Sequence, residues 1–209
     1  MTYGSFYEIT NPLTRVAKSH FVEWFSGKSY DSKRWTLISS GTAPTVAMQD
    51  SVDGGLLMTN TGAGGGGSIC FNGIKQYTNP CSCIMVIKNT TANGLGYAGF
   101  SSTGVPSIGL NNSVAAIEMG GAVYMSLITT DGGDPGGWNR AATSIATANT
   151  DWWAAKIDVR PTSVSLSMNG ILEAQSGVIP TTTMQPSVQG RNAGSNATTY
   201  IRYFEAWNN

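Results

Sequence analysis

Short apolar runs recur along the chain from Phe21 onward, and clusters of Gly, Asn, Ser, Thr and Pro separate them about every ten residues. Runs of this length with turn residues between them are typical of an all-β protein. They predict strands over residues 35–38, 45–49, 55–59, 68–71, 81–89, 96–101, 107–110, 115–118, 123–129, 152–159, 163–168, 171–176 and 198–207. This number of strands exceeds what one open sheet usually holds, so the pattern predicts two stacked antiparallel sheets.

The alternation inside individual runs indicates which face of a strand is buried. Residues 163–168 alternate Ser with Val, Leu and Met, so one face of this strand meets a core and the other meets water. Residues 81–88 are almost continuously apolar, which favours a central strand covered on both faces or a strand at a subunit interface. The Asn169-Gly170 pair predicts a two-residue hairpin with positive φ at both turn positions. No segment sustains a helical repeat, although residues 141–148 fit a short turn of helix.

The first twenty residues differ from the rest of the chain. Residues 1–20 contain the single His, a Pro and mixed charges, and they show no clean alternation. We therefore divide the chain into an N-terminal segment over residues 1–20, interpreted as an extended arm or a first edge strand, and a β-sandwich domain over residues 21–209. The apolar side chains of the arm are too few to make a core of their own, so the arm is expected to depend on a neighbouring surface.

The composition excludes several classes of protein. Only 11% of the residues are charged, and 12 basic residues balance 12 acidic ones. This balance excludes a nucleic-acid binder and a polybasic membrane anchor. The chain opens without the basic start and apolar stretch of a signal peptide, so we expect synthesis in a cytoplasm. The cysteines at 70, 81 and 83 lack the second pair that a zinc site requires, which favours reduced, mostly buried thiols.

No catalytic constellation is evident in the sequence. Hydrolysis of a glycosidic bond needs two carboxyl groups about 5–10 Å apart, and no predicted strand carries such a set. Glu118 and Glu205 are single and are expected to be solvent-facing strand residues. His20 has no Cys or Ser context for nucleophilic catalysis. The glycine run at 61–68 lacks the ending of a phosphate-binding loop. The sequence therefore predicts a protein that is not an enzyme and has no cofactor.

A loop over residues 130–139 contains the side chains best suited to a metal ion. Asp131, Asp134 and Asn139 offer only oxygen atoms, the ligands that calcium prefers. Their spacing does not match the helix-loop-helix calcium site, and the same residues are common in turns. An ordinary turn is the favoured interpretation, with calcium as the alternative.

Aromatic residues beside Asn and Ser loops are candidates for stacking on sugar rings or for a subunit interface. These candidates are Tyr97, Trp138 and Trp152. One ring of the Trp152-Trp153 pair must point inward and the other outward if the pair lies in a strand. Trp24, Trp35 and Trp207 are expected in the core.

Several segments, taken in order, carry a family resemblance. Residues 25–36 read FSGKSYDSKRWT, and WAAKIDV, VSLSMNGILEA and YIRYFEAW occur at 153–159, 164–174 and 200–207. These segments resemble the opening strand and closing hairpins of the concanavalin A-like lectin/glucanase superfamily, which includes the laminin G-like modules. The resemblance implies a jelly-roll sandwich over residues 21–209 and raises the expectation of sugar binding. The carboxylates of its glucanases and the metal-binding Asp and Asn of its legume lectins are not evident.

These observations lead to two expectations of function. The first is a non-enzymatic structural protein of a bacteriophage or other virus, a capsid decoration protein on the virion exterior. Its partners would be the major capsid protein or other virion subunits, and the arm and the nearly uncharged surface favour a homo-oligomer such as a trimer. The alternative is a carbohydrate-binding module or receptor-binding adhesin that uses the same sandwich to hold a glycan.

Overall fold

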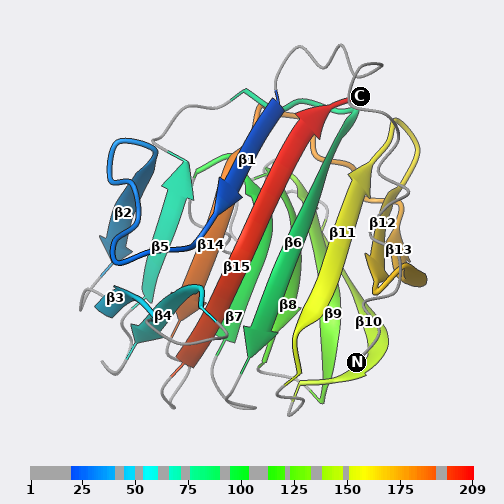
Figure 1. Cartoon of the computed structure of the whole chain (residues 1–209). Helices are drawn as coiled ribbons and strands as arrows, with labels where there is room; N and C mark the ends of the chain where they lie inside the picture. Colours follow the sequence, from blue (N-terminus) through cyan, green and yellow to red (C-terminus); the bar gives the residue numbers. More distant parts are fainter. Residues whose placement is uncertain are drawn as a thin grey trace.

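The computed structural model shows two antiparallel β-sheets packed face to face (Figure 1). It describes residues 20–40, 45–49, 54–60, 66–71, 76–89, 95–103, 113–120, 123–132, 138–147, 151–191 and 197–209. The all-β, two-sheet sandwich predicted from the alternation is confirmed. No helix in the described part of the chain is long and apolar enough to cross a membrane.

Sheet A forms one layer of the sandwich, and the C-terminal strand runs through it. Its strands, in spatial order, are β13 (Ile171–Ser176), β12 (Val164–Met168), β11 (Trp153–Val159), β6 (Cys81–Asn89), β15 (Ala197–Asn208), β4 (Leu56–Asn60) and β3 (Thr45–Met48). Strand β1 (His20–Trp24) also pairs with β15. Strands β1 and β4 pair with successive parts of β15, and β6 pairs with nearly its whole length (Figure 1).

Sheet B forms the second layer. Its order is β10 (Trp138–Ala146), β9 (Tyr124–Asp131), β8 (Ser113–Met119), β7 (Leu95–Ser101), β14 (Gln185–Arg191), β5 (Gly66–Phe71) and β2 (Trp35–Ser40). Strand β14 is thus a central strand that joins two groups of strands far apart in the sequence.

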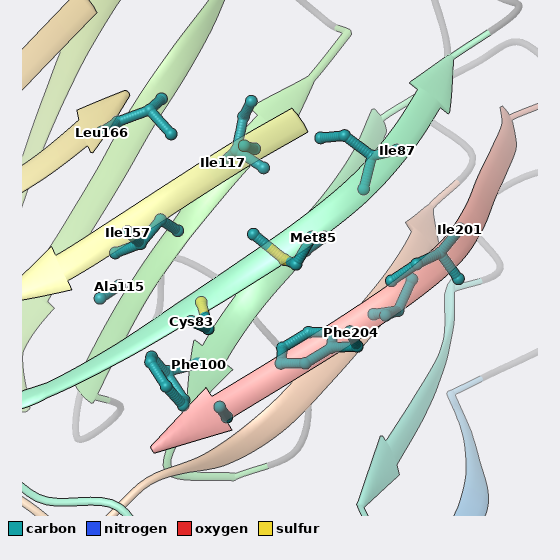
Figure 2. Packing of buried hydrophobic residues seen from close by; sticks show 14 of the residues in the cluster. Cys83, Met85, Ile87, Phe100, Ala115, Ile117, Ile157, Leu166, Ile201 and Phe204 are labelled. Atoms are coloured by element: carbon teal, nitrogen blue, oxygen red, sulfur yellow. The ribbon is translucent and has the colours of Figure 1, made fainter. Parts of the chain in front are cut away.

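The core fills the space between the sheets, and every second residue of a strand contributes to it. Along β6, Cys81, Cys83, Met85 and Ile87 are fully buried. Figure 2 shows three of them packed with Phe100, Ala115 and Ile117 of sheet B and with Ile157, Leu166, Ile201 and Phe204 of sheet A. The outward residues Ile84, Val86 and Lys88 are only partly buried. Strand β6 is therefore a central strand, as its apolar run predicts, but the prediction of cover on both faces is wrong, because its outward face is only partly buried. The alternative of a subunit interface stays a prediction.

Strand β10 corrects one local prediction. The sequence of residues 141–148 fits a turn of helix, but most of this segment belongs to β10 and pairs with β9. The helical interpretation is wrong because pairing with β9 satisfies the backbone groups of this alanine-rich segment and buries Ile145 in the core. The buried positions of this segment alternate at Thr143, Ile145 and Thr147, and because two of these residues are polar the sequence lacks the apolar alternation that marks a strand.

Strand β14 is absent from the strands that the sequence predicts. Its sequence, QPSVQGR, has only one large apolar residue, Val188, and that side chain is buried in the core. Gly190 also faces inward, where an added Cβ would lie 3.4 Å from Met58. A strand built of small and polar residues gives a weak sequence signal, so its place in the sheet is decided by its two neighbours.

The predicted hairpin between β12 and β13 is confirmed. Asn169 and Gly170 have φ values of 50° and 85°, as the two-residue turn requires. The side-chain oxygen of Asn169 also accepts a hydrogen bond of 3.0 Å from the backbone N–H of Ala154 in the neighbouring strand. The turn is therefore connected to β11 as well as to its own strands.

The remaining predictions about elements lie partly outside the described residues. Residues 1–19 and the strand predicted at 107–110 fall there, so the arm and the domain boundary stay predictions. Residue 20, the last residue assigned to the arm, is the first residue of β1.

Candidate functional site

A polar cluster lies on the face of sheet B that points away from the core. The register places Gln189, Tyr97, Glu118 and Ser126 opposite one another on four neighbouring strands, β14, β7, β8 and β9. Their strand neighbours Val188, Ala98, Ile117 and Leu127 are in the core, so alternation turns these four residues outward. The outward orientation of each residue follows from the period of two along its strand. The alignment of the four residues in one row follows from the pairing of strands that are distant in the sequence.

Glu118 is the centre of this cluster. The Tyr97 hydroxyl donates a hydrogen bond to Glu118 Oε1 over 2.9 Å, and the Arg140 guanidinium donates to the same oxygen over 2.7 Å. Only 1% of Glu118 is exposed, whereas 38% of the Arg140 side chain is exposed. The buried carboxylate therefore fixes the position of a guanidinium that reaches solvent.

The electrostatics of Glu118 follow from this burial. Loss of hydration raises the pKa of the Glu118 carboxyl, and the hydrogen bond from Tyr97 and the charge of Arg140 act in the opposite direction. Burial is the larger effect, so the folded protein binds this proton more tightly than the unfolded chain does. The sequence-based expectation that Glu118 faces solvent is wrong.

Two acceptors in the row have no partner within the described residues. Glu118 Oε2 and Gln189 Oε1 are both buried without a hydrogen bond there. A buried acceptor without a donor costs free energy, and a hydroxyl group or a water molecule would relieve that cost. The cluster thus combines a fixed cation with acceptors of the kind that hydroxyl-rich ligands satisfy.

The three aromatic candidates from the sequence do not form one site. Tyr97 belongs to the polar cluster of sheet B, and Trp138, the first residue of β10, pairs with Thr130 of β9 and precedes Arg140 by two residues. Trp152 instead lies beside Tyr200, at 6.3 Å between ring centroids, and Tyr200 is on β15 of sheet A. Trp153 packs against the core, so the predicted opposite orientation of the two rings is confirmed.

Only two of the three residues of the predicted calcium site lie within the described part of the chain. Asp131 ends β9 and Asn139 lies in β10, whereas Asp134 is outside the described residues. The backbone carbonyl of Asp131 already accepts hydrogen bonds from Ser113 Oγ and from Thr181. No group of three or more His, Cys, Asp or Glu residues within the described ranges is arranged to hold a metal ion. The calcium site stays a prediction.

The outward face of sheet B carries a single carboxylate among the described residues. The outward positions of β8 are Val114, Ala116 and Glu118. Asp131 is five residues along β9 from the partner of Glu118, a distance of about 17 Å at about 3.4 Å per residue, and its position alternates to the core side. The two carboxyl groups about 5–10 Å apart that glycoside hydrolysis needs are not present in this part of the chain.

Glu205 is the other glutamate that the sequence analysis considered, and it lies on the outward face of sheet A. It accepts a hydrogen bond of 2.7 Å from Tyr203 and is paired with His20 at 2.8 Å, and only 4% of it is exposed. The expectation of a solvent-facing Glu205 is therefore wrong. Strand β1 lies beside β15 in the same sheet and brings His20 against this carboxylate.

The three Trp residues expected in the core behave differently. Trp24 is 66% exposed and stacks on Tyr203 at 4.4 Å between ring centroids, so its prediction as a core residue is wrong. Alternation puts Trp24 on the outward side because Phe21 and Phe25 take the inward positions. Trp35 is buried in the core as predicted, and Trp207 is buried as well.

Sequence reasoning missed Arg140, Gln189 and the role of Glu118. The alternation along β8 was sufficient to place Val114, Ala116 and Glu118 on one face. The contact with Arg140 joins residues 22 positions apart through two strand pairings, and no local pattern indicates that register.

Comparisons with known proteins agree on the fold. A scan against protein-family models finds no match, and no curated protein matches in sequence. Among solved structures, a Bacillus licheniformis β-glucanase is similar with a TM-score of 0.62 and 17% identity, covering 91% of this chain and 98% of that one. A Crh5 transglycosylase gives 0.64 and 14% identity over 92% and 85% of the two chains. A family 16 endo-glucanase from Bacteroides ovatus gives 0.61 and 12% identity over 88% and 98%.

These similarities define the class of fold. The chain is an all-β, concanavalin A-like two-sheet sandwich, as the sequence resemblance implies. Identities of this size show the fold alone, and the same sandwich serves unrelated activities.

Proposed function

We propose that this protein binds a carbohydrate chain without hydrolysing it, through the outward face of sheet B at its β10 edge. The observation that carries the proposal is the Arg140–Glu118–Tyr97 cluster, in which a buried carboxylate holds a solvent-reaching guanidinium. Trp138 lies two residues before Arg140 on the same strand. A charged donor that reaches solvent, close in sequence to an aromatic residue, supplies the kinds of group that bind sugar hydroxyls and sugar rings.

The fold supports this class of ligand. The similar structures named above are described as a β-glucanase, a transglycosylase and an endo-glucanase, all of which act on carbohydrate. The absence of enzymatic activity is part of the proposal. It is supported by the single carboxylate on the outward face of sheet B within the described residues.

The roles of the residues differ. Glu118 and Tyr97 are almost completely buried, so they act as positioning residues. Arg140 is the group in this cluster that a ligand in solution meets, and Trp138 shares its strand two residues away. We therefore expect Arg140 and Trp138 to contribute most of the binding free energy. Glu118 is expected to hold the Arg140 guanidinium in place.

The test is calorimetric titration of the full chain with neutral β-glucan oligosaccharides. Arg140→Ala and Trp138→Ala are expected to weaken binding at least about tenfold, which corresponds to about 1.4 kcal/mol. Trp24→Ala removes an exposed aromatic from the opposite sheet and serves as the matched control with unchanged affinity. Absence of binding to a broad set of neutral glycans, or equal affinity of Arg140→Ala and the unmodified chain, would overturn the proposal.

A structural role in an oligomer on the exterior of a virion is our second proposal. Four exposed apolar side chains support subunit contact, at the start of β9 and in β13: Val123, Tyr124, Ile171 and Leu172. Surfaces of this kind are commonly buried between subunits. The carbohydrate-active structures named above do not support a viral origin, so the main support is the surface itself.

Light scattering on the purified chain tests this second role. A homo-oligomer that becomes monomeric in Leu172→Glu would support it, with Leu37→Glu as the control at an exposed apolar residue of β2. A monomer at all concentrations, with no binding to capsids that lack it, would contradict it.

A further inference from the structure

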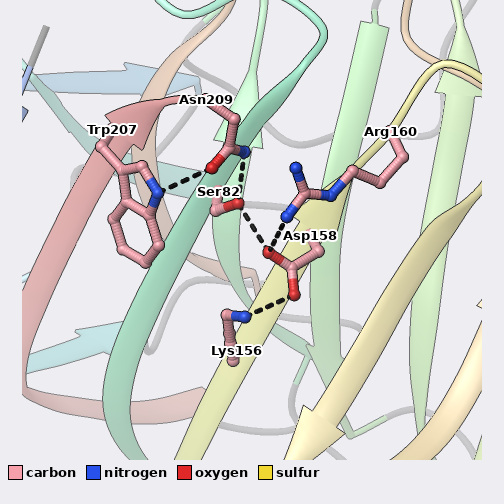
Figure 3. Close-up of polar contacts among 6 residues, drawn as sticks. All are labelled: Ser82, Lys156, Asp158, Arg160, Trp207 and Asn209. Atoms are coloured by element: carbon pink, nitrogen blue, oxygen red, sulfur yellow. Dashed lines mark hydrogen bonds and ion pairs between the residues drawn. The ribbon is translucent and has the colours of Figure 1, made fainter. Parts of the chain in front are cut away.

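Two carboxylates, one on the outward face of each sheet, are held by cations in different ways. Asp158, on sheet A, has Lys156 at 2.6 Å on one oxygen and Arg160 at 3.4 Å on the other (Figure 3). Glu118, on sheet B, has Arg140 at 2.7 Å on Oε1 as its single cation among the described residues. Asp158 is therefore shared by two positive charges, whereas Glu118 and Arg140 form a pair with no net charge.

The surroundings of Glu118 make the charge of this pair depend on one proton. Its direct register partners are Tyr97 of β7 and Ser126 of β9, and both present hydroxyl groups. Only 1% of Glu118 is exposed, so water screens its charge little. Its second oxygen, Oε2, accepts no hydrogen bond from a described residue. The cluster thus has no net charge when Glu118 is ionised, and it carries one positive charge when Glu118 is protonated.

Arg140 transmits this difference to the surface, because 38% of its side chain is exposed. A neutral sugar hydroxyl accepts a hydrogen bond from the guanidinium in either state of Glu118. An anionic group at the same place is attracted by the guanidinium and repelled by an ionised carboxylate behind it. Protonation of Glu118 removes the repulsion and leaves the attraction, so it strengthens the binding of an anionic group selectively.

We propose that Glu118 decides the charge of the carbohydrate bound at Arg140: when ionised it favours a neutral carbohydrate, and when protonated it admits an acidic one. This inference rests on the proposed function. Glu118 is too deeply buried to touch the ligand, so it acts through Arg140 as a positioning residue that determines specificity. Burial also raises the pKa of the Glu118 carboxyl, which brings the change of charge closer to neutral pH. Because linkage is reciprocal, binding of the acidic carbohydrate favours uptake of a proton by Glu118.

Calorimetric titration of the full chain with cellotetraose and with its 6-O-sulfate tests this selection. The sulfate ester stays ionised between pH 4 and pH 8, so only the protein changes its charge. We expect the ratio of the two affinities, sulfated over neutral, to rise at least about tenfold from pH 8 to pH 4. Glu118→Gln is neutral at every pH, so its ratio should be high at both values. Asp158→Asn removes a carboxylate from the opposite sheet and is the matched control, whose ratio should change as in the unmodified chain.

Nuclear magnetic resonance of the Arg140 Nε–H group gives a second readout that needs no ligand. Arg140→Lys identifies the signal in the spectrum of the full chain. The signal should shift with pH around a midpoint above the ordinary 4.5, because burial raises the pKa of Glu118. The same shift is expected in Asp158→Asn and not in Glu118→Gln. Dispersed backbone amide signals in the same spectra show that each variant is folded.

Failure of this inference and failure of the proposed function give different results. A ratio of affinities that is the same at pH 8 and pH 4, with both oligosaccharides bound, contradicts this inference alone. An Arg140 signal that does not respond to pH, or that responds equally in Glu118→Gln, also contradicts it. Binding of neither oligosaccharide at either pH overturns the proposed function, and this inference with it.

Discussion

The Tyr97 hydroxyl donates a hydrogen bond to Glu118 Oε1 over 2.9 Å, across neighbouring strands β7 and β8. The two residues are direct register partners, 21 positions apart in the sequence. This bond and the one from Arg140 hold a carboxylate of which only 1% is exposed. They also make its ionisation measurable through the stability of the protein.

The first prediction concerns the pH dependence that Glu118 introduces. Its pKa is raised by burial, so the folded state holds the proton more tightly than the unfolded state. The free energy of unfolding therefore falls as pH rises from about 4.5 through the raised pKa of the folded state. Glu118→Gln does not titrate, so its melting temperature relative to the unmodified chain should be higher at pH 8 than at pH 4.

Tyr97→Phe supplies the comparison for this prediction. It removes a donor that lowers the pKa of Glu118, so the loss of stability with rising pH should become steeper. Thermal melts of the three proteins between pH 4 and pH 8 measure both effects. Identical pH dependence of the unmodified chain and Glu118→Gln would show that Glu118 titrates normally.

The second prediction concerns Glu173, which joins the outer edges of the two sheets. Its carboxylate accepts hydrogen bonds from Ser144 Oγ at 2.7 Å and from the Ser144 N–H at 2.9 Å, and these lower the pKa of Glu173. The resulting stabilisation is present above the unfolded pKa and is lost as pH falls through the lowered value. Glu173→Ala should therefore lower the melting temperature at pH 7, and the difference should vanish in acid.

A double-mutant cycle is the control for Glu173. Ser144→Gly keeps the backbone donor but removes the hydroxyl, so it should lose part of the same stabilisation. Adding it to Glu173→Ala should cost less than it does alone. Full additivity of the two changes would mean that the contact contributes nothing to stability.

The third prediction concerns the hairpin turn at Gly170. A Cβ at this position would meet no atom within 4 Å, so any cost comes from the backbone φ of +85° alone. Gly170→Val should cost about 1–3 kcal/mol, which is about 2–4 °C of melting temperature per kcal/mol for a chain of this size. Gly177→Val is the matched control, because Gly177 is equally open and lacks a positive φ. Equal melting temperatures of the two variants would contradict the strain argument.

The fourth prediction concerns the buried thiols of β6. Burial raises the pKa of Cys81 to about 12 and raises the pKa of Cys83 well above its ordinary value. Since the thiolate is the reactive form, neither residue should react with a disulfide reagent in the folded protein at pH 8. Absorbance titration in a Cys70→Ser background should count no reactive thiol in the native state and two in denaturant. Rapid labelling of the native variant would show that the core between β6 and sheet B opens readily.

Local patterns were sufficient for much of the fold. The alternation at 163–168 and the Asn169-Gly170 turn predict β12, β13 and their hairpin because period-two burial and positive φ are properties of adjacent residues. The apolar run at 81–89 likewise predicts a central strand, and β6 has those bounds. Local patterns did not predict β14, which has few apolar residues, or the part of β10 whose buried positions include Thr143.

What the sequence by itself determined was the class of fold and the strands with strong alternation. The tertiary structure alone decided which polar residues meet. Glu118 gains Arg140 through the register of two strand pairings, and Trp152 gains Arg202 through a bulge in β15. The contact of Glu205 with His20 similarly depends on the pairing of β1 with β15, which are far apart in the sequence. The physical reason is that alternation is encoded by neighbouring residues, whereas register and bulges are selected by the packing energy of the whole sandwich.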